Sequence, residues 1–272
     1  MENLSIIIPI NKLDDDLTVR FVKAVESAKT EKIIVVGPQE VVDTVSKMTL
    51  PCPVKALLNT DGSDMATQIN FAVEHIDTEW FSVLEADDVF VDIWFANVEK
   101  YVKNHPEVSI FLPLSELVDP QGKELGFINE AVWATAFSDD LGVLNLDALS
   151  NYPNFNLTGA VINTAKFKEV GKLKPSIKFM FIYEFMLRFE YNSNVIMTVP
   201  KLGYLHTINR EGSLMVEYGK TMTAHEMQWW NKLAKTEYYF KEDRKKEYVK
   251  PENETESNKE TAIDKAAIDK VD

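Results

Sequence analysis

Three carboxylates are crowded into four consecutive residues of the chain, at Glu85, Asp87 and Asp88. Carboxylates this close repel one another unless a cation or a basic group offsets their charge. Mg²⁺ and Mn²⁺ prefer oxygen ligands and often bind through one or two carboxylates together with substrate phosphates. Side chains two residues apart share a face of an extended segment, so we expect Glu85 and Asp87 to point together and Asp88 to point away as a helix cap. The alternative is a polar turn that only caps a helix.

The segments before this acidic cluster alternate between short β-branched apolar runs and stretches with helical spacing. Strands are predicted at 4–10, 32–36, 54–58 and 80–84, and helices at 15–29, 40–48 and 64–76. This alternation predicts an α/β fold with a mostly parallel central sheet flanked by helices, Rossmann-like in its N-terminal half. Ligands of such sheets bind beyond the carboxyl ends of the strands, and the acidic cluster directly follows the fourth predicted strand.

The second half of the chain is less regular, and its predicted elements are shorter. Helices are predicted at 92–104, 164–171, 179–190 and 222–240, strands at 109–114, 159–162 and 195–199, and a hairpin turn at 118–124. The residues from Lys241 onward are nearly all charged or polar, a composition that predicts a disordered tail of acidic and basic residues at 241–272.

Composition excludes several classes of protein. The 272 residues carry a formal net charge of −14, which argues against generic nucleic-acid binding. No apolar stretch approaches the roughly 20 residues that a membrane span needs, and no signal peptide is apparent. The single Cys52 excludes an internal disulfide framework and fits a reducing compartment, so we expect a cytoplasmic protein.

Several segments, taken in order, resemble the family 2 glycosyltransferases. The first are Ser-Ile-Ile-Ile-Pro at 5–9, Lys-Ile-Ile-Val-Val at 32–36, Asn70 in a helix, and Phe-Ser-Val-Leu-Glu-Ala-Asp-Asp at 81–88. Further similar segments lie at 119–122, 157–162, 167–171, 183–188 and 203–207. The resemblance spans about residues 4–215. It implies a GT-A fold over 1–220, with a nucleotide-sugar-binding half at 1–115, an acceptor-side half at 116–220, and a separate aromatic helix at 221–240.

The resemblance also implies a site and a reaction. The family holds Mn²⁺ or Mg²⁺ at the position of Glu85-Ala86-Asp87 against the diphosphate of a nucleotide sugar, and a histidine at the position of His206 often completes the metal site. Residues expected to bind the nucleotide sugar are Pro9, Asn11, Gly37, Asn70, Glu85, Ala86 and Asp87. An acceptor hydroxyl on a glycan, protein or lipid-linked molecule would attack the sugar with inversion, while a carboxylate acts as general base.

The sequence departs from the family pattern at three places. Gly37-Pro38-Gln39 replaces an acidic residue that contacts the nucleoside base, and Glu85 replaces an aspartate. The catalytic Glu-Asp pair of the family falls on Phe181-Ile182, neither of which can accept a proton. Glu184 is then the candidate base, although it could instead pair with Arg188 four residues later. Asp139 and Asp140 are alternative bases.

These departures leave a second hypothesis, in which the protein keeps the fold but has lost the chemistry and serves as a binding or structural component of a larger assembly. His206 could likewise be an ordinary structural histidine. Trp229-Trp230 and the aromatic residues at 238–240 could bind a sugar, but core packing or an oligomer interface through this helix is favoured.

Overall fold

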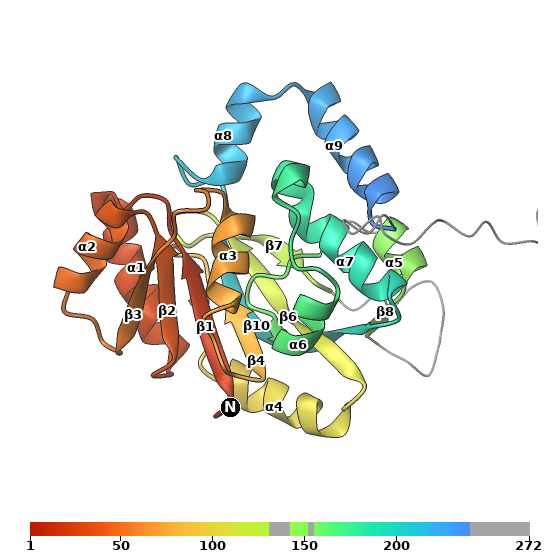
Figure 1. The fold of residues 1–272 in the computed structure, drawn as a ribbon, viewed down its shortest axis with the longest axis horizontal. Coiled ribbons are helices and arrows are strands. Elements are labelled where there is room, and N and C mark those ends of the chain that lie inside the picture. The colour runs from red at the N-terminus through yellow and green to blue at the C-terminus, as the bar shows by residue number, and fades with distance from the viewer. Residues whose placement is uncertain (131–141, 152–154, 240–272) are drawn as a thin grey trace, which may run out of the picture. The chain divides into compact units, whose positions relative to one another are not determined.

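The computed structural model describes residues 1–130, 142–151 and 155–239, and these belong to one compact unit, Met1–Tyr239. The predicted tail at 241–272 and the alternative bases Asp139 and Asp140 lie outside the described residues. A central sheet is flanked by helices on both faces, as the sequence predicts (Figure 1).

The N-terminal half is a parallel sheet in the strand order β3-β2-β1-β4. Its strands are β1 (Leu4–Pro9), β2 (Ile33–Gly37), β3 (Val54–Leu58) and β4 (Trp80–Val83). The connecting helices are α1 (Asp15–Ala28), α2 (Gln39–Lys47) and α3 (Met65–Val73). Because β1 pairs with β2 on one side and β4 on the other, the strand order reverses at β1, which is where ligands bind in doubly wound sheets.

The remaining strands make the sheet mixed. They are β5 (Val89–Phe90), β6 (Val108–Val118), β7 (Glu124–Ile128), β8 (Val143–Leu144), β9 (Val161–Asn163) and β10 (Val195–Thr207). The β9 strand is antiparallel to both β4 and β6, whereas β10 runs parallel to β6 over its whole length. The predicted hairpin at 118–124 is confirmed as the β6–β7 connection.

Four of the later helices lie close to the predicted limits, and three were not predicted. They are α4 (Trp94–Asn104), α5 (Leu146–Asn151), α6 (Thr164–Glu169), the 3-10 helix η1 (Pro175–Met180), α7 (Phe181–Tyr191), α8 (Leu214–Thr221) and α9 (Ala224–Glu237). Sequence reasoning missed α5, η1 and α8. Figure 1 shows α8 beyond the carboxyl ends of the parallel strands, where Tyr218 contacts Phe179 of η1 at 5.3 Å between ring centroids.

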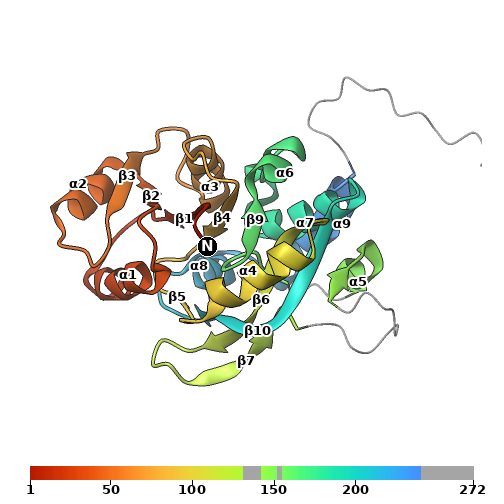
Figure 2. The ribbon, with the colours of Figure 1, turned by 90° about the horizontal axis from the view of Figure 1, so that it is seen from below.

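Two apolar clusters cover the two faces of the sheet. Successive residues of β1 alternate between them, so that Ile7 packs toward α3 while Ile6 and Ile8 pack toward α1. Figure 2 shows α1 and α4 on one side of the sheet and α3 and α6 on the other. Burial on both faces explains why this strand is a continuous apolar run rather than an alternating one.

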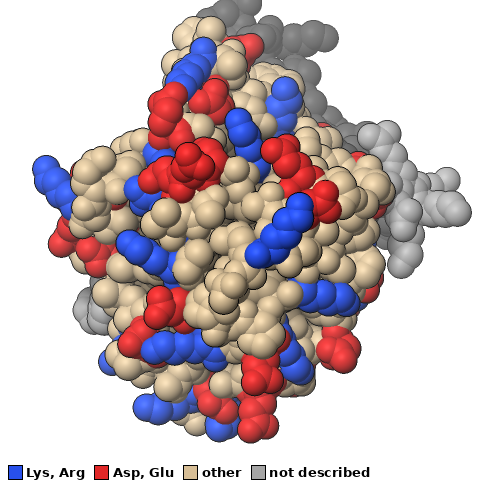
Figure 3. Space-filling model, turned by 90° about the vertical axis from the view of Figure 1, so that its left-hand side faces the viewer, with Lys and Arg blue, Asp and Glu red and all other residues tan. Residues whose placement is uncertain are grey.

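The charges on one face and the described helices can be compared with what the composition predicts. On the face drawn in Figure 3, acidic and basic side chains are interspersed rather than gathered by sign. Every described helix is too short or too polar to cross a lipid bilayer.

Candidate metal and nucleotide site

The acidic cluster occupies a tight turn directly after β4. The Asp88 N–H donates to the Glu85 carbonyl oxygen at 3.1 Å, which closes the turn over four residues. The Glu85 N–H donates to the phenol oxygen of the fully buried Tyr204 at 3.0 Å. Because the chain turns here instead of staying extended, Glu85 is brought together with Asp88, three residues on, rather than with Asp87.

Asp88 therefore faces the site, contrary to the expectation that it points away. Its Oδ2 lies 2.7 Å from Nδ1 of His206, and its Oδ1 accepts from the Thr207 N–H at 2.7 Å. The Thr207 hydroxyl donates to the Asp87 carbonyl oxygen at 2.7 Å. The end of β10 thus fixes the acidic turn, and Asp88 itself is only 1% exposed.

Glu85, Asp88 and His206 together form a candidate metal site. One ligand atom from each residue can be chosen so that the three lie within 4.8 Å of one another. The Glu85 carboxylate is the most accessible of the three, and its Oε1 lies 3.9 Å from Nδ1 of His206. Two carboxylate oxygens and one imidazole nitrogen suit Mn²⁺, and the carboxylates also suit Mg²⁺. The donor set therefore fits the divalent cation that the resemblance implies.

The charges of this cluster are offset by protons when no cation is present. Burial raises the pKa of Glu85 to about 8, and the neighbouring charges of Asp88 and Asp87 act in the same direction. Burial alone would lower the pKa of His206, but the charge and hydrogen bond of Asp88 outweigh it and raise that pKa to about 10. A divalent cation would replace these protons, since metal ligands bind in their deprotonated forms.

Asp87, the other carboxylate expected to bind metal, is paired with Arg210 instead. The Arg210 Nε lies 2.5 Å from Asp87 Oδ2, and Arg210 Nη1 donates to the Glu211 carbonyl oxygen at 3.0 Å. Burial and the charge of Asp88 raise the pKa of Asp87, while Arg210 opposes that rise. Sequence reasoning missed Arg210. The available signal was an arginine just before Gly212-Ser213 in the closing segment of the resemblance.

The residues predicted at the ends of β1 and β2 lie together at the same edge. Pro9 pairs with Val36, so the register places Ile10 beside Gly37 and Asn11 one residue further on. Gly37 packs so closely on the Ile10 carbonyl that a Cβ there would lie 2.3 Å from the carbonyl oxygen. Ala86 is buried in the acidic turn.

Asn70 lies in α3 but acts on a different part of the chain. Its Nδ2 donates to the Leu173 carbonyl oxygen at 2.8 Å, and its Oδ1 accepts from the Leu173 N–H at 3.0 Å. Both hydrogen bonds join α3 to the loop before η1. The Asn70 amide is therefore occupied by backbone groups and holds local structure.

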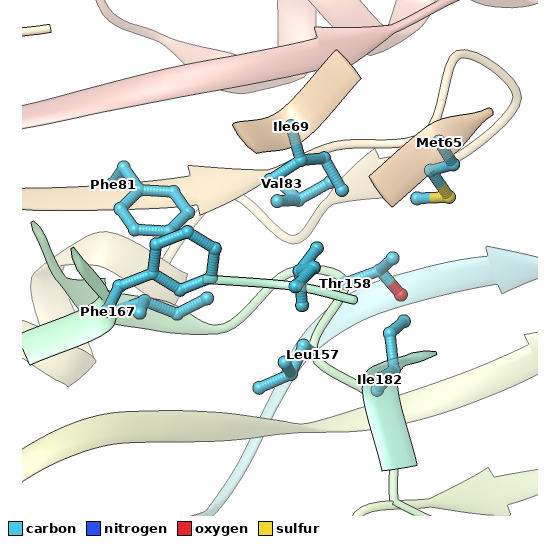
Figure 4. Close-up of a pocket in the computed structure, with 10 residues that line it drawn as sticks. Met65, Ile69, Phe81, Val83, Leu157, Thr158, Phe167 and Ile182 are labelled. Carbon is cyan, nitrogen blue, oxygen red and sulfur yellow. The ribbon is translucent and has the colours of Figure 1, made fainter. Parts of the chain in front are cut away.

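The start of α7 is apolar where the family pattern has its catalytic acids. Phe181 is buried, and Ile182 lines a narrow apolar pocket with Met65, Val83 and Thr158 (Figure 4). In the described part of the chain, no acidic residue lines that pocket.

Glu184 is fully buried and held by two cations. Arg188 binds it through two hydrogen bonds of 2.8 and 2.9 Å, and Lys174 Nζ lies 3.0 Å from its Oε1. The pairing with Arg188 four residues later is therefore confirmed. A carboxylate enclosed in this way cannot reach an acceptor hydroxyl, so its placement argues against the general-base role.

Of the two tryptophans of α9, Trp230 packs against neighbouring side chains and Trp229 is exposed. Trp230 packs edge-on against Trp229 and under the Lys178 ammonium, whereas Trp229 remains 55% exposed. Ala234 is buried in the core beneath the helix. An oligomer through α9 stays a prediction.

No family model and no curated protein sequence matches the chain. The fold does match solved structures of S. aureus TarS residues 1–349, with a TM-score of 0.56 at 16% identity, over 75% of this chain and 60% of that one. The UDP-GlcNAc complex matches with a TM-score of 0.60 at 16% identity, over 79% of this chain and 60% of that one. The UDP complex matches with a TM-score of 0.55 at 14% identity, over 84% of this chain and 78% of that one. The chain thus spans about 60% of the length of the first two structures. The likeness confirms the expected GT-A fold.

Proposed function

We propose that this chain is a glycosyltransferase that moves a sugar from a nucleotide-diphosphate sugar to an acceptor hydroxyl and depends on a divalent metal. The observation that carries the proposal is the convergence of Glu85, Asp88 and His206 where the strand order reverses. Chains of the same fold have been solved with UDP and with UDP-GlcNAc, which supports a nucleotide-sugar ligand at this edge.

Each side chain of the site has a definable role in this proposal. Glu85, Asp88 and His206 would hold Mn²⁺ or Mg²⁺, which offsets the charge that develops on the diphosphate as the sugar leaves. Arg210 adds a fixed positive charge at the rim of the same turn, suited to a phosphate oxygen. Residues 1–115 would bind the nucleotide sugar, and residues 116–220 would face the acceptor.

The acceptor hydroxyl must lose a proton as it attacks. An inverting transfer needs one general base for this step. Because Glu184 is enclosed, we assign the candidate role to Asp139 or Asp140, which lie outside the described residues. The acceptor class stays open among glycans, proteins and lipid-linked molecules.

One structural observation favours a second candidate function. The apolar Phe181-Ile182 pair and the enclosed Glu184 leave the start of α7 without an accessible carboxylate. A chain that binds the nucleotide sugar without transferring it would serve as a binding component of a larger assembly. Fold alone does not decide between the two functions.

A single experiment separates these functions. The chain is incubated with Mn²⁺ and a panel of nucleotide sugars, and release of nucleoside diphosphate is measured by chromatography alongside the thermal shift. Release above that of the Asp88→Asn variant supports the transferase. A thermal shift without release supports the binding component, because a ligand of the native state must stabilise it. Neither signal in folded protein would contradict both functions.

The remaining partners follow from surface and composition. We propose no generic nucleic-acid partner, given the net charge of −14. We propose a cytoplasmic location, given the free Cys52. An oligomer through the exposed Trp229 would be visible by light scattering and lost in Trp229→Lys.

A further inference from the structure

Tyr204 of β10 packs against the acidic turn, and its ring is completely enclosed. The residue is fully buried, and its ring lies 5.4 Å from that of Phe90 between centroids. Gly159 is so close that a Cβ there would fall 2.5 Å from the Tyr204 ring. Because close packing leaves the ring little freedom to shift, its hydroxyl oxygen reaches the turn at a fixed position.

This hydroxyl holds the first residue of the turn. Its oxygen accepts the Glu85 N–H at 3.0 Å. Burial raises the pKa of the hydroxyl well above its usual value, and the charges of Asp88 and Glu85 raise it further. The hydroxyl therefore stays protonated, and its proton is available to the neighbouring Asp88 carboxylate.

The sheet itself does not fix Glu85. The last backbone hydrogen bond that aligns this part of the chain with β1 is made by Leu84, whose N–H donates to the Ile7 carbonyl oxygen at 2.9 Å. Among the described residues, no backbone carbonyl accepts the Glu85 N–H. The position of Glu85 therefore depends on a side chain of β10, 119 residues further along the sequence.

Two side chains of the same strand hold the two ends of the turn. Tyr204 and His206 are two residues apart, so they project from one face of β10, and their ring centroids lie 6.3 Å apart. Tyr204 binds Glu85 at the start of the turn, whereas His206 binds Asp88 at its end. The separation of the two carboxylates is thus set by the spacing of two residues along one strand.

We propose that Tyr204 is a positioning residue for the divalent metal, because its hydroxyl keeps Glu85 close enough to Asp88 and His206 for one cation to bind all three. This inference rests on the proposed metal and nucleotide site. Tyr204 is fully buried, so it acts through Glu85 and does not contact the ligand. Loss of the hydroxyl should leave the three metal ligands present but let Glu85 move away from the other two.

The test is Tyr204→Phe, which removes one oxygen and keeps the ring in its enclosed position, so the variant is expected to fold. UDP binding to the full chain is measured by isothermal titration calorimetry, first in Mn²⁺ and then in excess chelator. The ratio of the two affinities reports the metal-dependent part of binding. In Tyr204→Phe this ratio should fall roughly tenfold, as it does for groups that orient metal ligands, while affinity in chelator should stay at the wild-type value.

Tyr183→Phe is the matched control. Tyr183 is also buried, and its hydroxyl donates to the Leu149 carbonyl oxygen at 3.0 Å, a contact between α7 and α5. Each variant loses one buried hydroxyl and one hydrogen bond, so both should lower the melting temperature by a few degrees. Only Tyr204→Phe should lower the affinity ratio, which separates positioning of the metal ligands from a general loss of stability.

The outcomes separate the inference from the function on which it rests. If wild-type protein does not bind UDP, or binds it equally with Mn²⁺ and with chelator, the proposed metal-dependent site fails and this inference fails with it. If wild-type binding depends on Mn²⁺ and Tyr204→Phe keeps the same ratio, only the positioning role is overturned. An equal fall of the ratio in Tyr183→Phe would also overturn that role.

Discussion

Asp88 and His206 are joined side chain to side chain at 2.7 Å although 118 residues separate them in the sequence. The contact links the turn after β4 to the end of β10, two parts of the chain that meet only through the sheet. It brings a buried carboxylate and an imidazole next to the accessible Glu85. Several testable properties of the site depend on this arrangement.

Asp88→Asn should weaken nucleotide binding in the presence of Mn²⁺ by roughly 10- to 100-fold, because it removes one oxygen ligand and the charge that orients His206. Calorimetry with UDP, in Mn²⁺ and then in excess chelator, measures the effect. The matched control is Asp92→Asn, an exposed carboxylate paired with Lys29, which should leave affinity unchanged. Equal affinity in wild type and Asp88→Asn would contradict the metal assignment.

Asp87→Asn should cost less metal-dependent affinity than Asp88→Asn, although the sequence pattern alone predicts the reverse. Asp87 is engaged by Arg210, whereas Asp88 faces Glu85 and His206. The same titration, applied to both variants, shows which of the two substitutions costs more metal-dependent affinity. A larger loss for Asp87→Asn would mean that Arg210 releases Asp87 to the cation when ligand is bound.

Mn²⁺ affinity should increase as the pH rises through about 8, the raised pKa of Glu85. Below that pH the Glu85 carboxyl holds a proton that the cation must displace, and above it this carboxyl is ionised, while His206 keeps its proton up to a pKa of about 10. Isothermal titration at several pH values, in buffers of different ionisation enthalpy, measures both the affinity and the protons released. Affinity that is flat or falls across this range would contradict the expectation.

Glu184→Gln should lower the free energy of unfolding by about 3–5 kcal/mol, the usual cost of breaking a buried ion pair from one side. The buried Lys174 and Arg188 would keep their charges without the carboxylate. Chemical denaturation measures the change. Glu169→Gln is the control, since its pair with Lys166 is exposed and should contribute less than about 1 kcal/mol.

Gly37→Ala should destabilise the protein by about 1–3 kcal/mol, because the added methyl group must displace the Ile10 carbonyl from a contact of 2.3 Å. Gly219 in α8 offers the opposite case, with open space at its Cβ position. Gly219→Ala should stabilise α8 by roughly 0.5–1 kcal/mol through helix propensity. Thermal unfolding should show a lower melting temperature for Gly37→Ala and a higher one for Gly219→Ala than for wild-type protein.

The sequence was sufficient for the local elements and for the place of the acidic turn. Strands such as β1 and β2 are continuous β-branched runs, and α1 carries apolar residues at helical spacing, so neighbours in the chain specify them. The alternation of these elements also predicted that the sheet formed by the first four strands is mostly parallel. Elements of two residues, such as β5 and β8, carry too little pattern to be detected.

Tertiary structure alone decided which side chains share the site. The strand rule favoured Asp87 as the partner of Glu85, but the tight turn after Val83 brings Asp88 forward and leaves Asp87 to Arg210. The contact of Asp88 with His206, and the hydrogen bond from Gln68 to Asn11, join residues far apart in sequence. Periodicity records which residues face the core, whereas ion pairs and hydrogen bonds require distances of about 3 Å that only the folded chain establishes.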